Sequence, residues 1–184
     1  MFTTLTIAVS GEHGAGKTTV AMALAETFNL RYVSAGMIFR RLAEERNKTL
    51  AEFGRIAEQD PEIDRAIDDR TRHEAAQGKV VLDAYISGWV ARDLADLKIY
   101  LHAPFELRVR RIAEREQRPY RDVLEETKAR EESQKQRFLK FYGIDVGAIR
   151  LFDLVLNTAL WDVTGVVTIC VEAVHYLCNS SSTG

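Results

Sequence analysis

A glycine-rich stretch near the start of the chain constrains the fold more than any other feature of the sequence. Two glycines five residues apart, Gly11 and Gly16, are followed directly by Lys17 and Thr18. The stretch follows a short apolar run at 4–9 and precedes a helical pattern, which is the setting that a phosphate-binding loop requires. The loop comprises Gly11, Glu12, His13, Gly14, Ala15, Gly16, Lys17, Thr18 and Thr19. The sequence therefore predicts a strand, a phosphate-binding loop and a helix in succession.

The residue types of this loop suit the binding of a nucleotide phosphate. Glycines let backbone N–H groups turn toward a polyanion, and the N-terminus of the following helix adds the positive end of its dipole. We expect Lys17 to neutralise the transferred phosphate and Thr18 to offer its hydroxyl to Mg²⁺. Glu12 and His13 fill positions that the motif leaves open. A glycine turn without a ligand is the alternative, and a chance match to the motif is expected in roughly 1% of such chains or fewer.

Short apolar runs alternate with helical patterns along the rest of the chain. The further runs expected to be strands are residues 31–34, 80–83, 98–102 and 154–157. Helices are expected over 36–78, over a densely charged arm at 115–140 that breaks at Arg118-Pro119, and over 163–177. Strands that alternate with helices need crossover connections and form a parallel sheet. The predicted fold class is α/β, a five-stranded parallel sheet with helices on both faces in three layers.

Size and charge limit the remaining possibilities. The 184 residues, 46% of them hydrophobic, suffice for one domain, expected over 1–178, with a flexible polar tail at 179–184. The formal net charge of −2 argues against a nucleic-acid partner and against a polybasic membrane anchor. No window approaches the roughly 18 apolar residues of a membrane-spanning helix. We therefore expect a cytoplasmic monomer with neither a nucleic-acid nor a membrane partner.

The phosphate loop by itself leaves several activities open. A GTPase is disfavoured because the chain has no Asn-Lys-x-Asp motif for guanine. ATPases that drive motors or transporters usually need a longer chain. A small-molecule kinase is the remaining class, and its acceptor has to be identified from other residues.

Six further motifs follow the loop in order. They are Ser34-Ala35-Gly36-Met37-Ile38-Phe39-Arg40, Asp60-Pro61-Glu62-Ile63-Asp64, Ala95-Asp96-Leu97-Lys98-Ile99, Arg130-Glu131-Glu132-Ser133, Tyr142-Gly143-Ile144-Asp145 and Phe152-Asp153-Leu154-Val155-Leu156-Asn157-Thr158. Together with the loop, this combination resembles the cytidylate kinases of the archaeal type, over nearly the whole chain. The resemblance implies a P-loop kinase fold that transfers the γ-phosphoryl group of ATP to CMP or dCMP with Mg²⁺. It also implies a monophosphate-binding insertion at about 36–78 and a mobile lid at about 115–130.

The resemblance assigns residues to the acceptor nucleotide. It implies that Arg40 holds the acceptor phosphate and that Ser34 and Gly36 line the same site. Asp83, at the carboxyl end of the third strand, is expected to hold Mg²⁺ through a water. Related kinases carry an acid-Gly-Arg motif at this point, whereas the chain has Asp83-Ala84-Tyr85. Tyr85 can replace only part of the arginine's contact to the acceptor phosphate, through one neutral hydrogen bond.

Further arginines are implied to bind the ATP phosphates. Arg111 and Arg115 share one helix face and are implied to contact adenine and the triphosphate, and Asn157 is expected to pass by the adenine. Arg130 and Arg137 are seven residues apart and are expected to reach into one cleft when the lid closes. The expected catalytic residues are Lys17, Arg115, Arg130 and Arg137. The arginines expected to be solvated are Arg108, Arg110 and Arg118.

The missing arginine keeps two alternatives to a CMP kinase open. The chain could be a kinase whose acceptor is another monophosphate or a small hydroxyl compound. It could also be a nucleotide-binding protein with little catalysis. An acceptor screen with ATP and Mg²⁺ separates the two kinases, and ATP binding without turnover of any acceptor would identify the third possibility.

Overall fold

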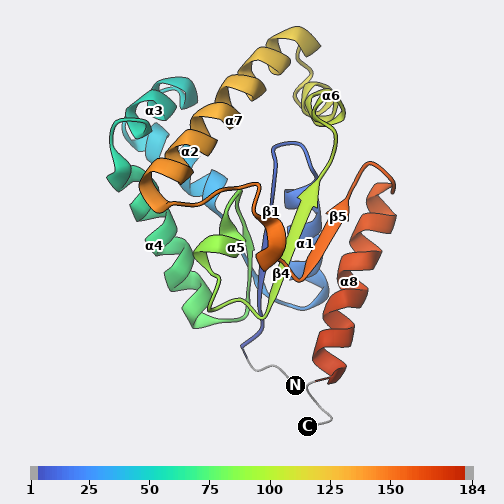
Figure 1. Cartoon of the computed structure of the whole chain (residues 1–184). Helices are drawn as coiled ribbons and strands as arrows, with labels where there is room; N and C mark the ends of the chain where they lie inside the picture. The colour runs from blue at the N-terminus through green and yellow to red at the C-terminus, as the bar shows by residue number, and fades with distance from the viewer. Residues whose placement is uncertain (1–3, 181–184) are drawn as a thin grey trace.

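The computed structural model describes residues 4–180, which build a parallel sheet between two layers of helices (Figure 1). The strands are β1 (Thr6–Gly11), β2 (Arg31–Ser34), β3 (Val80–Asp83), β4 (Leu97–His102) and β5 (Leu154–Asn157). They are hydrogen-bonded in the order β2-β3-β1-β4-β5, and every pairing is parallel. The predicted α/β class is thus confirmed. Strand β1 lies where the strand order reverses, and open sheets of this kind bind ligands at the carboxyl ends of such strands.

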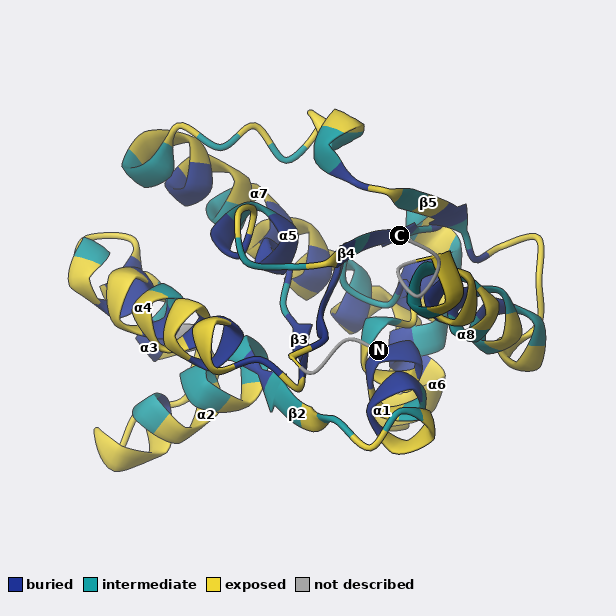
Figure 2. Ribbon diagram, turned by 90° about the horizontal axis from the view of Figure 1, so that it is seen from below, coloured by how far each residue is buried: buried dark blue, intermediate teal, exposed yellow. Residues whose placement is uncertain are grey.

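Helices cover both faces of the sheet. Successive residues of a strand point to opposite faces, so neighbours in one strand pack against different helices. The helices are α1 (Lys17–Thr27), α2 (Ala35–Glu45), α3 (Leu50–Ala57), α4 (Pro61–Gln77), α5 (Ser87–Val90), α6 (Phe105–Glu116), α7 (Tyr120–Tyr142) and α8 (Val163–Ser180), with a 3₁₀ turn at Ile149–Leu151. Val81 packs with α1 and α8, whereas its neighbours Val80 and Leu82 pack with Ala75 of α4, as side-chain alternation along a strand requires. The inner strands β1, β3 and β4 are therefore buried between helix layers, whereas the edge strands β2 and β5 are partly exposed (Figure 2).

Helices α2, α3 and α4 occupy the interval where the insertion is expected, and local sequence signals set their ends. Thr49 and Glu52 form a capping box at the start of α3, and Asp60 caps α4 ahead of Pro61. The insertion has a hydrophobic core of its own, centred on the fully buried Phe53. A separate small core lies between α6 and α7, and the charged arm expected at 115–140 falls mainly on α7.

The bounds of strand β1 and the presence of helix α5 differ from the sequence expectation. Strand β1 runs on to Gly11, because Ser10 and Gly11 pair with Tyr100 and Leu101 of β4. Helix α5 is not predicted from the sequence, because four residues are too few to show a helical period.

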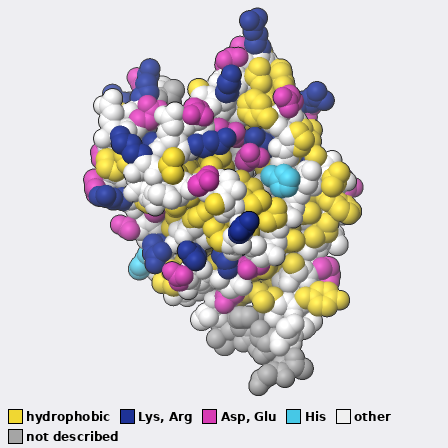
Figure 3. Space-filling view, in the orientation of Figure 1, with side chains coloured by type: hydrophobic (Ala, Val, Ile, Leu, Met, Phe, Trp, Pro, Cys, Tyr) yellow, Lys and Arg dark blue, Asp and Glu magenta, His cyan; other side chains and the backbone are white. Residues whose placement is uncertain are grey.

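The C-terminal helix α8 is longer and more apolar than expected. It includes Asn179 and Ser180, which the sequence assigned to the flexible tail, and the tail's other four residues lie outside the described range. By length and composition α8 could cross a membrane, contrary to the sequence expectation, but one such helix is weak support for a membrane span. Its buried face packs on the sheet through Cys170 and Val174. Hydrophobic side chains reach the surface on this side of the molecule (Figure 3), and Tyr176 is 74% exposed.

Candidate active site

The phosphate loop follows the carboxyl end of β1, and close backbone contacts require two of its glycines. Gly11 has a φ of 135°, and a Cβ there would lie 1.9 Å from the carbonyl oxygen of Leu101. Gly14 has a φ of 77°, and its Cβ would lie 2.5 Å from the carbonyl oxygen of Arg108. Any side chain at either position would displace backbone, so the path of the loop depends on glycine. Gly16 then leads directly into α1, which places a helix N-terminus at the loop.

Lys17, Thr18 and Asp83 meet at this loop. Lys17 Nζ donates to the carbonyl oxygen of Glu12 at 2.8 Å. Thr18 Oγ1 donates to Asp83 Oδ2 at 2.8 Å, and the Tyr32 hydroxyl donates to the same oxygen at 2.8 Å. Removal from water lowers the pKa of Lys17 to about 8, although the Asp83 carboxylate opposes that shift. The structure thus brings the expected phosphate ligand and the two expected magnesium ligands together.

Arg108 is buried beneath the loop, so the expectation that it is solvated is wrong. The residue is 3% exposed. Its guanidinium donates to the carbonyl oxygens of Ala103 and His13 at 2.9 and 2.8 Å, and to both carboxylate oxygens of Glu131 on α7. It also lies 3.1 Å from Glu12 Oε2. A buried charge is tolerated when it is paired and hydrogen-bonded in this way. Arg108 therefore joins the phosphate loop to α7.

Replacing Arg108 by Met is expected to lower the free energy of unfolding by about 3–5 kcal/mol, because the Glu131 carboxylate stays buried without its partner. The double variant Arg108→Met/Glu131→Met should regain much of this loss, since both charges are then gone. Arg110→Met is the matched control, because Arg110 is exposed on the same helix as expected. Urea unfolding measures all three. An Arg108→Met protein as stable as the wild type would contradict the buried ion pair.

His13 and Tyr85 lie side by side between the loop and α7. His13 Nε2 donates to Gln134 Oε1 at 2.6 Å. The ring centroids of His13 and Tyr85 are 5.6 Å apart, and Tyr85 also packs on Phe138 of α7. Burial, together with the positive charge of Arg130, lowers the pKa of His13 well below 6.5. His13 is therefore a neutral hydrogen-bond donor at pH 7.

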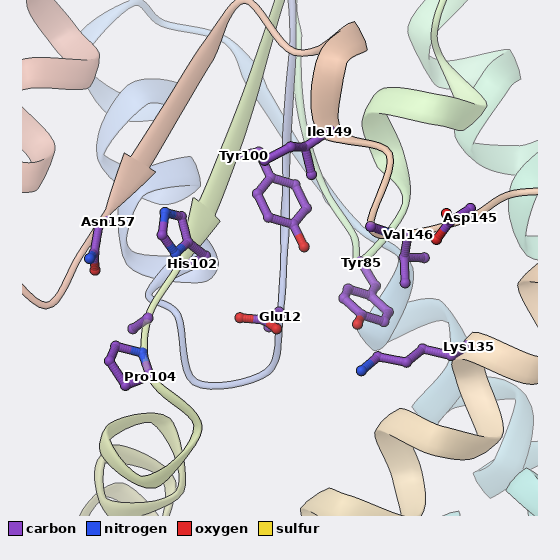
Figure 4. A pocket seen from close by; sticks show the side chains of 12 residues that line it. Glu12, Tyr85, Tyr100, His102, Pro104, Lys135, Asp145, Val146, Ile149 and Asn157 are labelled. Atoms are coloured by element: carbon purple, nitrogen blue, oxygen red, sulfur yellow. Dashed lines mark hydrogen bonds between the residues drawn. The ribbon is translucent and has the colours of Figure 1, made fainter.

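A cavity of about 640 Å³ lies beside the loop, within the size range of small-ligand sites (Figure 4). The Glu12 carboxylate, the Tyr85 and Tyr100 hydroxyls and the Lys135 ammonium group point into it. Arg40, the residue expected at the acceptor phosphate, is not one of the described residues that line this cavity. The Tyr85 hydroxyl therefore faces a cavity that Arg40 does not line.

The start of α2 gathers the residues expected around that phosphate. Ser34 caps the helix, its Oγ accepting from the Met37 N–H at 3.4 Å. A Cβ at Gly36 would lie 3.8 Å from Arg40 Nη2, so this arginine folds back over the first turn. Removal from water and the positive charge of Arg40 lower the pKa of Arg130 on α7. A helix N-terminus and two arginines from separate elements thus meet, an arrangement that suits an anion.

Arg137 lies further along α7 and is only 6% exposed. Its Nη1 donates to Asp64 Oδ1 of α4 at 3.3 Å. Its positive charge also contributes to the lowered pKa of Arg130, so the two arginines of α7 lie close enough to affect each other. Asp64 closes the motif at 60–64, but no individual role is expected for it, because local sequence does not separate a buried carboxylate in a charged helix from a solvated one.

The residues expected near adenine are only partly together. Arg111 donates to Thr158 through both of its guanidinium nitrogens, at 2.9 Å to Oγ1 and 2.8 Å to the carbonyl oxygen. Asn157 Oδ1 accepts from the Ala159 N–H at 3.0 Å and so shapes the same turn. Arg115 instead pairs with Glu116 at 2.7 Å, and its side chain is 66% exposed. Within residues 4–180, no hydrogen bond or ion pair joins Arg115 to the phosphate loop.

Known proteins resemble the chain in sequence over most of its length. A family model described as the cytidylate kinase-like family matches residues 6–160. A cytidylate kinase of Staphylothermus marinus is 49% identical over 152 residues, which are 83% of this chain and 86% of that protein. A cytidylate kinase of Halobacterium salinarum is 46% identical over 170 residues, 91% of this chain and 88% of that protein.

Solved structures share the fold at low sequence identity. A gluconokinase from Sinorhizobium meliloti superposes with a TM-score of 0.63 at 12% identity, covering 97% of this chain and 96% of that one. A shikimate kinase from Acinetobacter baumannii, in complex with shikimate, superposes with a TM-score of 0.59 at 16% identity, covering 95% and 94%. At such identity these likenesses show the fold alone.

Proposed function

The chain belongs to the cytidylate kinase-like family, and on that premise we propose that it transfers the γ-phosphoryl group of ATP to CMP or dCMP. The products are ADP and CDP or dCDP. The observation that carries this proposal is the family match over 6–160, which spans the phosphate loop, helices α2 to α4, and helices α6 and α7. The enzyme is therefore a nucleoside monophosphate kinase.

In the proposed site, the residues align two phosphates and neutralise their charge, which is what phosphoryl transfer mainly demands. The loop N–H groups and Lys17 hold the ATP phosphates, and Arg111 supports the turn that follows β5. Arg40 holds the acceptor phosphate from the side of α2, and Arg130 lies near Arg40, where it neutralises the phosphoryl group in transfer. The proposal is supported by their arrangement, since positive groups from the loop, α2 and α7 converge.

Mg²⁺ is the metal that this donor set fits. The Thr18 hydroxyl and the Asp83 carboxylate are adjacent hard oxygen donors. Among residues 4–180, no group of three or more His, Cys, Asp and Glu side chains could hold a metal ion. Mg²⁺ keeps several waters and takes few protein ligands beside the substrate phosphates. When bound, it would neutralise developing negative charge, and Thr18 and Asp83 would hold it, the latter through a water.

The insertion at 36–78 and the lid at 115–130 are assigned in this proposal to acceptor binding and to closure over ATP. The separate hydrophobic cores of the insertion and of the α6–α7 pair support the assignment. The cytoplasmic location and the monomeric state stay predictions from the sequence.

The lowered pKa of Lys17 predicts a fall in kcat/KM for ATP at alkaline pH. Burial disfavours the charged amine and lowers its pKa to about 8, so the neutral form grows as the pH rises through that value. Only the ammonium form attracts the phosphates. We expect a limb with an apparent pKa near that value in the CMP-bound enzyme before ATP binds, measured with ATP varied at saturating CMP. In Lys17→Arg this limb should disappear, because a guanidinium stays charged over the range.

An acceptor screen tests the proposal itself. ADP formation is followed in a coupled assay with CMP, dCMP, UMP, AMP, GMP, shikimate and gluconate, each with ATP and Mg²⁺. We expect the highest kcat/KM with CMP or dCMP. Turnover confined to a hydroxyl compound would move the acceptor outside the monophosphates, and ATP binding without turnover of any acceptor would contradict a kinase.

A further inference from the structure

Four polar side chains between α4 and α7 have buried atoms without hydrogen bonds. Among residues 4–180, every buried side-chain nitrogen or oxygen atom without a hydrogen-bond partner belongs to this cluster. The atoms are Asp64 Oδ2, Asp68 Oδ2, Arg137 Nε and the Tyr142 hydroxyl oxygen. Asp64 and Asp68 are one turn apart on α4 and share a face. Because buried polar groups are normally hydrogen-bonded, their concentration at one place points to a ligand.

The ion pair at the centre of the cluster uses only part of its bonding capacity. Arg137 Nη1 approaches both carboxylate oxygens of Asp64, at 3.3 Å to Oδ1 and 3.2 Å to Oδ2, but only the first contact has hydrogen-bond geometry. Arg137 and Asp64 are 6% and 7% exposed. Arg137 Nε and Asp64 Oδ2 are therefore both buried and both without a hydrogen-bond partner.

The cluster lies next to the proposed site of the acceptor phosphate. Arg130, whose pKa the charges of Arg40 and Arg137 lower, is two helical turns before Arg137 on α7. Ser133, between them, donates to Glu58 Oε1 of the insertion at 2.6 Å. The insertion thus faces α7 along this stretch, with arginines at one end and the carboxyl cluster at the other. A nucleoside monophosphate has the same polarity, with its phosphate at one end and a polar base edge at the other.

We propose that Asp64 and Asp68 recognise the base of the acceptor nucleotide, Asp64 as an ionised acceptor for the exocyclic amino group of cytosine and Asp68 as a protonated donor to its ring N3. This inference rests on the proposed function and names the feature that selects its substrate. Cytosine presents an amino donor where uracil presents a carbonyl acceptor. At ring position 3, cytosine presents an acceptor nitrogen, whereas uracil presents an N–H donor. An acceptor beside a donor therefore matches cytosine and leaves both hydrogen bonds to uracil unmade.

The surroundings of the two carboxyl groups make them unequal. Burial raises the pKa of Asp64, but the guanidinium of Arg137 opposes the shift. Burial raises the pKa of Asp68 to about 7, and the negative charges of Asp64 and Asp69 on α4 add to this. The groups that act against it come from α7: the Tyr142 hydroxyl faces the Asp68 carboxyl, although their contact falls short of hydrogen-bond geometry, and the guanidinium of Arg137 adds its positive charge. The proton of the pair thus resides on Asp68, and it is lost as the pH rises through about 7.

Two isosteric variants test this assignment by steady-state kinetics with CMP and UMP, at saturating ATP, from about pH 6 to 8.5. In the wild type, KM for CMP should rise above neutral pH. In Asp68→Asn the amide donates at every pH, so KM for CMP should stay near the wild-type value at low pH and lose that rise. In Asp64→Asn the charged acceptor is gone, so KM for CMP should increase about 10- to 100-fold, the equivalent of one hydrogen bond to a charged group. The preference for CMP over UMP should fall with it.

Glu62→Gln is the matched control, since Glu62 is an exposed carboxylate of the same helix paired only with Arg65 at its surface. It should leave both KM values and the pH profile unchanged. Calorimetric titration with CMP and with UMP, without ATP, gives a second readout that needs no turnover. If Asp64→Asn fails to fold, the pH profile and the CMP titration of Asp68→Asn decide alone.

The possible failures are distinct. An active kinase whose KM for CMP, pH profile and CMP preference are the same in both variants overturns the base-recognition role and leaves the proposed function standing. A wild type that phosphorylates no monophosphate overturns the proposed function. Unchanged affinity for CMP in the titration of both variants then overturns the present inference as well.

Discussion

Lys17→Ala should lower kcat by about three orders of magnitude or more, while the protein remains folded. The Lys17 ammonium group is placed at the loop, where negative charge develops on the transferred phosphoryl group. Its hydrogen bond in the structure goes to the backbone of Glu12, and Glu12 is only half-buried, so water can replace the lost donor. Single-turnover kinetics with ATP and CMP, together with a melting curve, measure the effect.

Lys48→Ala is the control for this variant, because Lys48 is exposed between α2 and α3. It should retain wild-type kcat. A Lys17→Ala protein with kcat within a few-fold of the wild type would remove the phosphate loop from the mechanism.

Arg130→Met should lower kcat by about 10³-fold and change the affinity for ATP far less, because an arginine that neutralises the moving phosphoryl group acts mainly on the transition state. Arg130 is the better residue for this test than Arg137. Among the described residues Arg130 makes no ion pair with a buried carboxylate, whereas Arg137 is buried against Asp64, and removing Arg137 would leave a buried carboxylate unpaired.

The measurement compares kcat with the dissociation constant of ATP, in Arg130→Met and in the control Arg121→Met. Arg121 is exposed near the start of the same helix and should be replaceable without effect. Equal losses in ATP affinity and in kcat would assign Arg130 to ground-state binding instead.

Local signals were sufficient for the fold and for the phosphate loop. Strands β2, β3 and β5 have the predicted bounds, because each is a short apolar run between polar turns. The starts of α3 and α4 follow from caps that the sequence displays directly, at Thr49 and at Asp60-Pro61.

Contacts between residues far apart in the chain determine which charged side chains are buried, and local sequence does not predict them. Arg108 is buried because Glu131, 23 residues further along, neutralises it, and nothing in either local sequence distinguishes the pair from surface charges. Asp68 belongs to a helix with many charges, and its raised pKa comes from burial in the folded chain. Arg115 had motif support, yet it pairs with Glu116 at the surface. Side-chain direction depends on tertiary contacts that spacing alone does not contain.

The central claim is that the chain moves a phosphoryl group from ATP to CMP, and identification of the products by ³¹P NMR tests it most directly. The reaction contains the wild-type enzyme, ATP, CMP and Mg²⁺, and a parallel reaction contains Lys17→Ala. The account predicts that CDP and ADP appear in equal amounts with the wild type and that neither accumulates with the variant. ADP that appears with inorganic phosphate, while CMP is unchanged, would contradict it.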